Sequence, residues 1–348
     1  MDFAYNEHDL TEKSSSTRFQ PVISSTKFAE ELRGIDYIRK TKTEQMDNYQ
    51  IRTKLYDAES LYEGYDPAVE ESYKDCYDGQ VYARYIRKGS SCSDVSITLA
   101  RTLHDHYISA AMHEFLKDYK AKAVVGIMGG HGLLRNDPVF RKVAIISKRL
   151  TERGKLMVSG GGPGAMEATH LGAWMAGRSE EELDEAIALL SAKAPSFKDG
   201  SWLSSAFEVM QKYPRIIPED NSAEGYLSLG IPTWLYGHEP ATPFATHIAK
   251  YYTNSIREDQ IVSIATGGLI FAPGSAGTMQ EIFQDAAQNH YKTCGICSPM
   301  IFLGREHYSS NVPVYPFLED LAARGIYKNL SLSLTDSEDE AIEQISKF

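Results

Sequence analysis

Phe271-Ala-Pro-Gly-Ser-Ala-Gly-Thr-Met-Gln-Glu281 is a glycine-rich turn that joins an expected strand to an expected helix. The apolar residues 267–272 predict a buried strand, and residues 279–290 predict a helix. A loop at a helix N-terminus presents backbone N–H groups without an intrahelical partner, and these groups favour an anion such as phosphate. We expect Glu281 in the first turn of the helix, pointing back toward the loop. A carboxylate beside a phosphate site indicates chemistry next to the phosphate rather than binding alone.

Two further glycine-rich loops follow expected strands. Residues 123–128 lead into Gly129-Gly-His-Gly132, and residues 155–159 lead into Gly160-Gly-Gly-Pro-Gly164. Pro163 suits the first position of the next helix, because a residue there needs no N–H donor. Three such loops place free N–H groups along one edge of a parallel sheet, which is where open α/β sheets bind ligands. The sequence therefore predicts an α/β fold with a doubly wound, Rossmann-like parallel sheet.

The chain divides into three parts. Residues 1–25 are polar and rich in Ser and Thr, and we expect them to be disordered. Residues 26–119 are expected to form a mainly helical N-terminal region, with helical spacing of apolar residues over 93–116. Residues 120–348 alternate expected strands and helices, as a parallel sheet with right-handed crossovers requires. The other elements expected there are helices over 180–190 and 202–211, one or two strands over 226–234, and a strand over 300–303.

Two of these loops together resemble a known pair of motifs. Gly160-Gly-Gly-Pro-Gly-Ala-Met-Glu167 and Pro273-Gly-Ser-Ala-Gly-Thr-Met-Gln-Glu281 are similar to GGGxxGxM and PGGxGTxxE of the LOG (lonely guy) family. Glu239-Pro-Ala-Thr-Pro243, and an expected helix from there to Arg257, resemble the larger bacterial branch, the nucleotide 5′-monophosphate nucleosidases. The resemblance covers residues 120–335. It implies a LOG-type nucleotide-binding and catalytic domain that hydrolyses a nucleoside 5′-monophosphate to free base and ribose 5-phosphate.

The resemblance also implies roles for individual residues. The family's catalytic glutamate falls on Glu281, which would stabilise positive charge at C1′ and activate water. Its catalytic arginine falls on Arg257, which would orient Glu281 or contact the phosphate. The family further implies a homodimer or higher homo-oligomer, and we expect neither a cofactor nor a metal ion. The residues expected at the substrate or its phosphate are Gly274, Ser275, Ala276, Gly277, Thr278, Gly160, Gly161, Gly162, Gly164, Met166, Gly129, Gly130, His131 and Glu239.

The chain departs from the family pattern at several positions. Ser275 occupies the third position of PGGxGT, and Gln280 replaces a glutamate that many members carry. Glu258 and Asp259 follow Arg257, where the family usually has Lys or Leu. The departures at Ser275 and Gln280 leave open an alternative hypothesis, a non-catalytic nucleotide-sensing or carrier module that uses the same phosphate site.

Two other enzyme classes fit the sequence less well. A nicotinamide-dependent dehydrogenase needs G-x-G-x-x-G after its first strand. The glycines at 126, 129, 130 and 132 do not have that spacing. A pyridoxal-phosphate decarboxylase, an older label for the family, has no support because neither main loop contains a lysine.

Composition limits the partners and the location. The chain has 348 residues and a formal net charge of −11, which disfavours binding to a nucleic-acid polymer. No apolar run reaches the roughly 18 residues of a membrane span, and the N-terminus lacks a signal-peptide layout. We therefore expect a cytoplasmic protein that binds neither a nucleic-acid polymer nor a membrane. The resemblance to the LOG family implies that its partner is a small-molecule nucleotide. Cys294 and Cys297 form a lone C-x-x-C, which we interpret as ordinary thiols in a loop.

Overall fold

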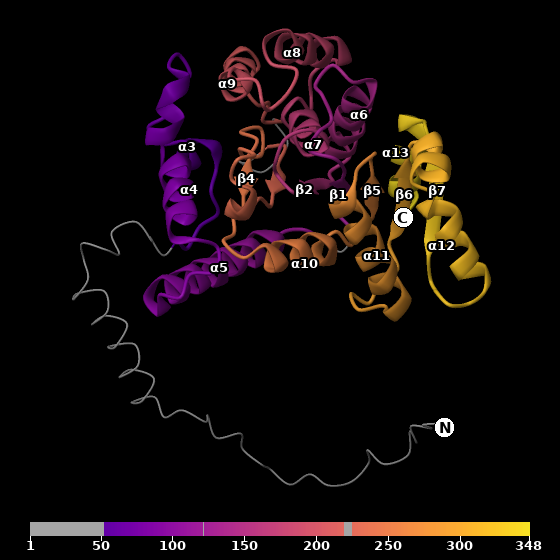
Figure 1. Ribbon diagram of the computed structural model, residues 1–348. Coiled ribbons are helices and arrows are strands. Elements are labelled where there is room, and N and C mark those ends of the chain that lie inside the picture. Colours follow the sequence, from indigo (N-terminus) through magenta and orange to yellow (C-terminus); the bar gives the residue numbers. More distant parts are fainter. Residues whose placement is uncertain (1–51, 121, 219–224) are drawn as a thin grey trace. The chain divides into compact units, whose positions relative to one another are not determined.

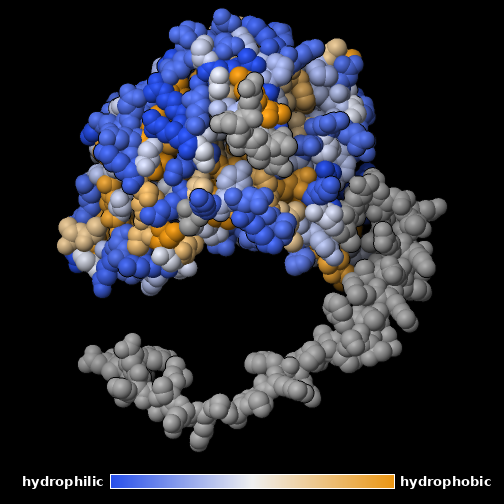
Figure 2. All heavy atoms as spheres, turned by 180° about the vertical axis from the view of Figure 1, so that it is seen from behind, coloured by the Kyte–Doolittle hydropathy of each residue, from blue (hydrophilic) through white to orange (hydrophobic). Residues whose placement is uncertain are grey.

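The structure, a computed structural model, describes residues 52–120, 122–218 and 225–348. The disorder expected for residues 1–25, and residues 26–51 of the expected helical region, lie outside the described residues. Within the described ranges, no helix combines the length and the apolar character needed to cross a lipid bilayer. The face shown in Figure 2 is mostly hydrophilic, with hydrophobic residues in scattered patches.

The core of the described chain is a parallel sheet of seven strands (Figure 1). The strands are β1 (Val124–Met128), β2 (Leu156–Ser159), β3 (Ser228–Gly230), β4 (His247–Ile248), β5 (Leu269–Phe271), β6 (Pro299–Leu303) and β7 (Ser331–Thr335). Their order is β4-β3-β2-β1-β5-β6-β7, and every neighbouring pair is parallel. The chain builds outward from β1 to β4 and then from β5 to β7. This is the predicted doubly wound sheet, and its switch point lies between β1 and β5.

Helices cover both faces of the sheet (Figure 1). One face carries α6 (Pro138–Glu152), α7 (Ala165–Trp174), α8 (Glu180–Lys193), α9 (Trp202–Lys212) and α13 (Glu338–Lys347). The other carries α5 (Val95–Leu116), α10 (Asn254–Ile264), α11 (Ala276–Tyr291) and α12 (Val314–Ala323). Along β1, Val125 and Ile127 belong to the core under the helices of the first face. Val124 and Met128 belong to the core under the helices of the second face. Successive side chains of a strand point to opposite faces, so burial on both sides explains the nearly continuous apolar runs.

The described part of the N-terminal region is helical and attaches to the edge of the sheet. Its elements are α3 (Ala58–Leu61), the 3₁₀ helix η1 (Glu70–Asp75), α4 (Tyr77–Lys88) and α5. Tyr56 donates its backbone N–H to Ile248 O at 2.9 Å, and Ile248 donates back to Tyr56 O at 2.7 Å. The region thereby covers the outer edge of β4, which would otherwise present unpaired backbone groups.

Two helix starts differ from the predictions. α11 begins at Ala276 rather than at residue 279, because Ser275 is the N-cap and Gly277 already lies in the helix. Glu281 consequently lies in the second turn of α11 and not in its first. α7 begins at Ala165, after Gly164 as N-cap with a φ of 69°, so Pro163 precedes the helix instead of opening it.

The prediction of a helix that leads up to Arg257 was wrong. Residues 244–253 contain only the short strand β4 and irregular backbone, and α10 begins at Asn254. β4 pairs with β3 on one side and with Tyr56 on the other, so the segment is enclosed on both edges. Such enclosure favours extended backbone over a helix that keeps one face in water. Of the one or two strands expected over 226–234, one forms, β3, followed by the 3₁₀ helix η2 (Trp234–Tyr236).

Candidate functional site

A cleft of about 290 Å³ opens at the carboxyl ends of the central strands. It lies beside the switch point between β1 and β5, where doubly wound sheets bind ligands. The structure brings most of the predicted site residues together here. Those that line the cleft are Gly129, Gly130, His131, Gly160, Gly162, Met166, Glu239, Arg257, Ser275, Gly277, Thr278 and Glu281.

The remaining predicted residues do not line the cleft, and they are Gly161, Gly164, Gly274 and Ala276. Gly164 instead lets two loops touch, since a Cβ there would lie 2.4 Å from Gly130 O. The next residue, Ala165, donates its N–H to the same Gly130 oxygen at 3.2 Å. The carbonyl of Gly161 accepts from Thr242 N–H at 2.8 Å, which ties the second loop to the segment after Glu239. These contacts shape the cleft wall from behind.

Two helix N-termini meet the cleft without a side-chain cap. The N-caps are Gly164 of α7 and Ser275 of α11, and neither makes a side-chain capping hydrogen bond. By contrast, Asp137 caps α6 and Ser179 caps α8 through their side chains. First-turn N–H groups need a partner. Ala165 N–H of α7 already donates to Gly130 O, and an anion in the cleft would supply a partner for the remaining first-turn N–H groups of the two helices.

Arg257 reaches the cleft from the first turn of α10. A Cβ on Gly160 would lie 2.9 Å from Arg257 Nη1 and 2.6 Å from Met166 Sδ, so the absence of a side chain at Gly160 leaves room for both groups. Arg257 Nη2 lies 3.7 Å from Glu258 Oε1. Arg257 Nε is buried and has no hydrogen-bond partner among the described residues. The guanidinium therefore retains donor capacity that an anionic ligand could use.

Glu281 is a partly buried residue whose side chain carries a carboxyl group, and it lines the same cleft. Burial raises the pKa of Glu281 from 4.5 to about 7, the positive charge of Arg257 lowers it, and the negative charge of Glu258 raises it further. Loss of hydration disfavours the ionised form, which is why burial is the largest cause. Glu281 can therefore exchange a proton near neutral pH, as a general base or acid must.

His131 and Glu239 also line the cleft. His131 Nδ1 lies 3.6 Å from Glu239 Oε1, and His238 Nε2 lies 3.8 Å from the same oxygen. The His131 ring also meets Phe197 edge-on, with centroids 5.9 Å apart. Both polar side chains are thus placed to contact a ligand above the glycine loops.

Sequence reasoning missed part of the lining. Glu258 is adjacent in sequence to a predicted residue, and proximity to Arg257 was the available signal. The other three lining residues that were not predicted are Pro232, Thr233 and Tyr236. They follow β3, a three-residue strand without a glycine-rich loop after it, so no motif marked them. The unpredicted lining residues are Pro232, Thr233, Tyr236 and Glu258.

A larger hollow of about 420 Å³ lies on the other side of residues 237–240, between Phe197 and the tyrosines Tyr65, Tyr73 and Tyr82. None of the predicted site residues lines it. We assign the candidate site to the smaller cleft because uncapped helix ends, a buried guanidinium nitrogen and a carboxyl with a raised pKa converge there.

The two cysteines of the C-x-x-C are free thiols. Cys294 Sγ donates to Ser263 O at 3.5 Å, and Cys297 Sγ donates to Asn289 O at 3.7 Å. Across the described ranges, no three His, Cys, Asp or Glu side chains are arranged to hold a metal ion.

The fold and the cleft define a doubly wound α/β protein with a glycine-lined cleft at its switch point. No protein-family model matches the chain, and no curated protein matches it. Among solved structures, it is similar to the molybdenum cofactor binding protein of Rippkaea orientalis, at 14% identity and a TM-score of 0.40, over 64% of this chain and 95% of that one. It is also similar to the molybdenum cofactor carrier protein of Chlamydomonas reinhardtii, at 14% identity and a TM-score of 0.39, over 64% and 96%. Similarity at this level assigns neither family nor function, and the fold class rests on the strand order.

Proposed function

We propose that the cleft binds a nucleotide-like small molecule through its phosphate. The observation that carries this proposal is the buried Nε of Arg257, which has no partner among the described residues although its guanidinium lies against the second glycine loop. The uncapped N-termini of α7 and α11 supply N–H donors at the same place. A phosphate carries enough acceptor oxygens to engage the guanidinium and both helix ends at once.

Holding the ligand without cleaving it is the simpler use of this site. It needs only the phosphate contacts, whereas turnover also needs an ionised Glu281 next to a bound phosphate. We therefore put forward a sensing or carrier role first. The molybdenum cofactor, which the similar solved proteins are described as binding or carrying, is a further ligand to test for that role.

Hydrolysis of the N-glycosidic bond is the second candidate, and the raised pKa of Glu281, about 7, favours it. A general base works best when its pKa lies near the working pH. In this reaction Glu281 would accept a proton from water as the water oxygen bonds to C1′. The electron pair of the C1′–N bond would leave with the nucleobase, which takes up a proton from solvent. Arg257 would hold the 5′-phosphate, and the enzyme would be a phosphoribohydrolase.

Titration calorimetry with AMP, GMP, IMP, CMP and UMP, each beside its nucleoside, tests the binding proposal. We expect at least one nucleotide to bind more tightly than its nucleoside. Arg257→Ala should lower the affinity for that nucleotide by about tenfold or more, which is the effect of losing a charge-assisted hydrogen bond. Arg324→Ala, which removes an exposed arginine paired with Asp320, should change nothing. Equal binding of nucleotide and nucleoside, or no effect of Arg257→Ala, would refute the proposal.

The same samples separate the two roles. Free base and ribose 5-phosphate released by the wild type, and not by Glu281→Gln, would establish hydrolysis. A bound nucleotide recovered intact after prolonged incubation would establish the sensing or carrier role.

A further inference from the structure

We propose that Asp105, in the N-terminal helical region, is a positioning residue for Arg257 in the cleft. The inference rests on the proposed function, because it concerns how the phosphate-binding arginine is held in place. It assigns part of the site to a region whose sequence carries no recognisable phosphate loop.

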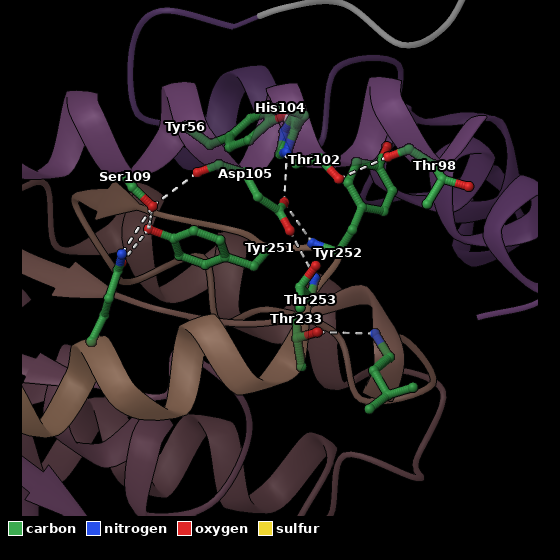
Figure 3. Close-up of polar contacts among 12 residues, drawn as sticks. Tyr56, Thr98, Thr102, His104, Asp105, Ser109, Thr233, Tyr251, Tyr252 and Thr253 are labelled. Carbon is green, nitrogen blue, oxygen red and sulfur yellow. Dashed lines mark hydrogen bonds and ion pairs between the residues drawn. The ribbon is translucent and has the colours of Figure 1, made fainter. Parts of the chain in front are cut away.

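Asp105 holds the start of the helix that carries Arg257. Its buried carboxylate projects from α5 toward the backbone that leads into α10 (Figure 3). Oδ1 accepts the N–H of Tyr252 and Oδ2 accepts the N–H of Thr253, each at 2.9 Å. Thr253 is the N-cap of α10 and makes no side-chain capping bond of its own. Its carbonyl accepts Arg257 N–H at 3.5 Å. The residue held by Asp105 therefore begins the turn on which Arg257 lies.

Asp105 is itself fixed by a buried chain of hydrogen bonds (Figure 3). His104 Nδ1 lies 3.1 Å from Asp105 Oδ1, and His104 Nε2 lies 2.9 Å from Tyr56 Oη. A carboxylate only accepts, so His104 donates from Nδ1 and its Nε2 is left to accept from the tyrosine. All three side chains are buried. The carboxylate is thus oriented as firmly as the backbone that it binds.

A second attachment fixes the direction of α10. Ser109 lies one turn beyond Asp105 on α5, and Gln260 of α10 donates from Nε2 to Ser109 Oγ at 2.9 Å. Ser109 Oγ also lies 3.2 Å from Tyr251 Oη, and Tyr251 Oη donates to Gln260 Oε1 at 2.5 Å. Two directional attachments set both the origin and the axis of the helix, which non-directional apolar packing does less sharply. A binding group loses its effect when it moves by about 0.5 Å, so such support matters.

The test is a double-mutant cycle on affinity for the tightest-binding nucleotide. Asp105→Asn keeps the shape, but its amide nitrogen cannot accept, so one of the two backbone N–H groups loses its partner. We expect affinity to fall about tenfold in the otherwise wild-type chain and by less than about twofold in the Arg257→Ala background. Equal losses in both backgrounds would overturn the inference, because a general loss of stability adds to the effect of Arg257→Ala.

Two further variants keep the test decisive. Ser109→Ala removes the hydroxyl of the second attachment, together with its bond to Asp105 O within α5 at 2.9 Å. It leaves the Asp105 carboxylate in place and should show a smaller loss with the same dependence on Arg257. It serves as the test if Asp105→Asn fails to fold. Thr102→Val, on the exposed side of α5, removes only a hydroxyl that bonds Thr98 O and should not change affinity. A loss with Thr102→Val equal to that with Asp105→Asn would contradict the inference.

Hydrogen exchange without ligand separates this inference from the proposed function. In Asp105→Asn, the amides from Tyr252 to Arg257 should exchange faster than in wild type and in Thr102→Val. Unchanged exchange would show that Asp105 does not hold the start of α10. A wild-type chain that binds no nucleotide would refute the proposed function, and the exchange measurement would still decide whether Asp105 positions Arg257.

Discussion

Gln280 and Glu258 are joined by a hydrogen bond across two helices: Gln280 Nε2 donates to Glu258 Oε2 at 3.0 Å. Asn254 Nδ2 donates to the other carboxylate oxygen at 2.6 Å. Gln280 and Glu258 are both positions where the chain departs from the LOG pattern. A glutamate at 280 would place one carboxylate opposite another beside the cleft, and glutamine removes that repulsion while supplying a donor. The departures at Gln280 and Glu258 therefore form one compensated pair that joins α10 to α11.

Introducing the glutamate of the LOG pattern at position 280 should lower stability. Gln280→Glu replaces a hydrogen bond with a like-charge pair, and for exposed groups we expect a loss of about 0.5 kcal/mol in the free energy of unfolding. Salt should reduce the loss. Urea unfolding at low and high ionic strength measures it. Adding Glu258→Gln should recover the loss, and an equally stable Gln280→Glu at low salt would contradict this account.

A side chain at Gly160 should obstruct the ligand site. Gly160→Ala places a Cβ 2.9 Å from Arg257 Nη1 and 2.6 Å from Met166 Sδ. Both groups must then move, and we expect nucleotide affinity to fall by about fivefold to tenfold, in line with a typical overpacking cost. Gly132→Ala is the matched control, since a Cβ there meets nothing within 4 Å. Calorimetry on both variants checks this, and equal affinities would contradict it.

Nucleotide affinity should depend on pH through Glu281. With a pKa of about 7, this carboxyl is mostly neutral below that value and ionised above it. An ionised Glu281 repels a phosphate, so affinity should fall as pH rises from about 6 to about 8. Hydrolysis would follow the opposite course, because only the ionised form accepts a proton from water. Calorimetry and product assays across this range distinguish the two trends.

Glu281→Gln is the control for that titration. The amide has no charge to lose, so the fall in affinity attributable to Glu281 should disappear. The phosphate's own titration near pH 6 is common to both proteins. A variant whose affinity falls as steeply as that of the wild type would assign the effect to another group.

Asp285 should make the fold less stable as pH rises. Burial raises its pKa from 3.8 to about 8, and its Oδ2 has no hydrogen-bond partner among the described residues. Between those values the folded chain keeps a proton that the unfolded chain releases, so the free energy of unfolding falls as pH increases. Asp285→Asn should flatten this dependence. Denaturant unfolding between about pH 5 and about pH 8 tests it, with the exposed Asp320→Asn as control.

The sheet and its loops were predictable because the local signals agree. The strands β1, β2 and β5 are apolar runs buried on both faces, and each is followed by a glycine-rich loop. That combination has few alternatives. The start of α11 was missed because Gly277 and Thr278 were assigned to the glycine-rich loop, although both fit a first helical turn. The approach to Arg257 was misassigned because its apolar residues are buried by contacts from distant segments. No local pattern shows that Tyr56 pairs with Ile248.

The cleft was predictable only in part, for a related reason. Its glycines and Glu281 belong to motifs, and each motif is short and continuous. Tyr236 and Thr233 reach the cleft through a brief 3₁₀ helix after a three-residue strand. Asp105 acts on the site from a helix well over a hundred residues earlier in the chain. Contacts of that sequence separation depend on the completed tertiary structure.

The attachment of α5 to α10 has a thermodynamic corollary, because coupling between two parts of a molecule is reciprocal. To the extent that Asp105 improves ligand affinity through Arg257, a bound ligand must strengthen the attachment of α10 to Asp105 by the same free energy. An occupied cleft would then suppress local opening of α5, which carries His104, and of Tyr56, which is hydrogen-bonded to that histidine. The N-terminal helices would thereby sense whether the switch point of the sheet is filled, without touching the ligand.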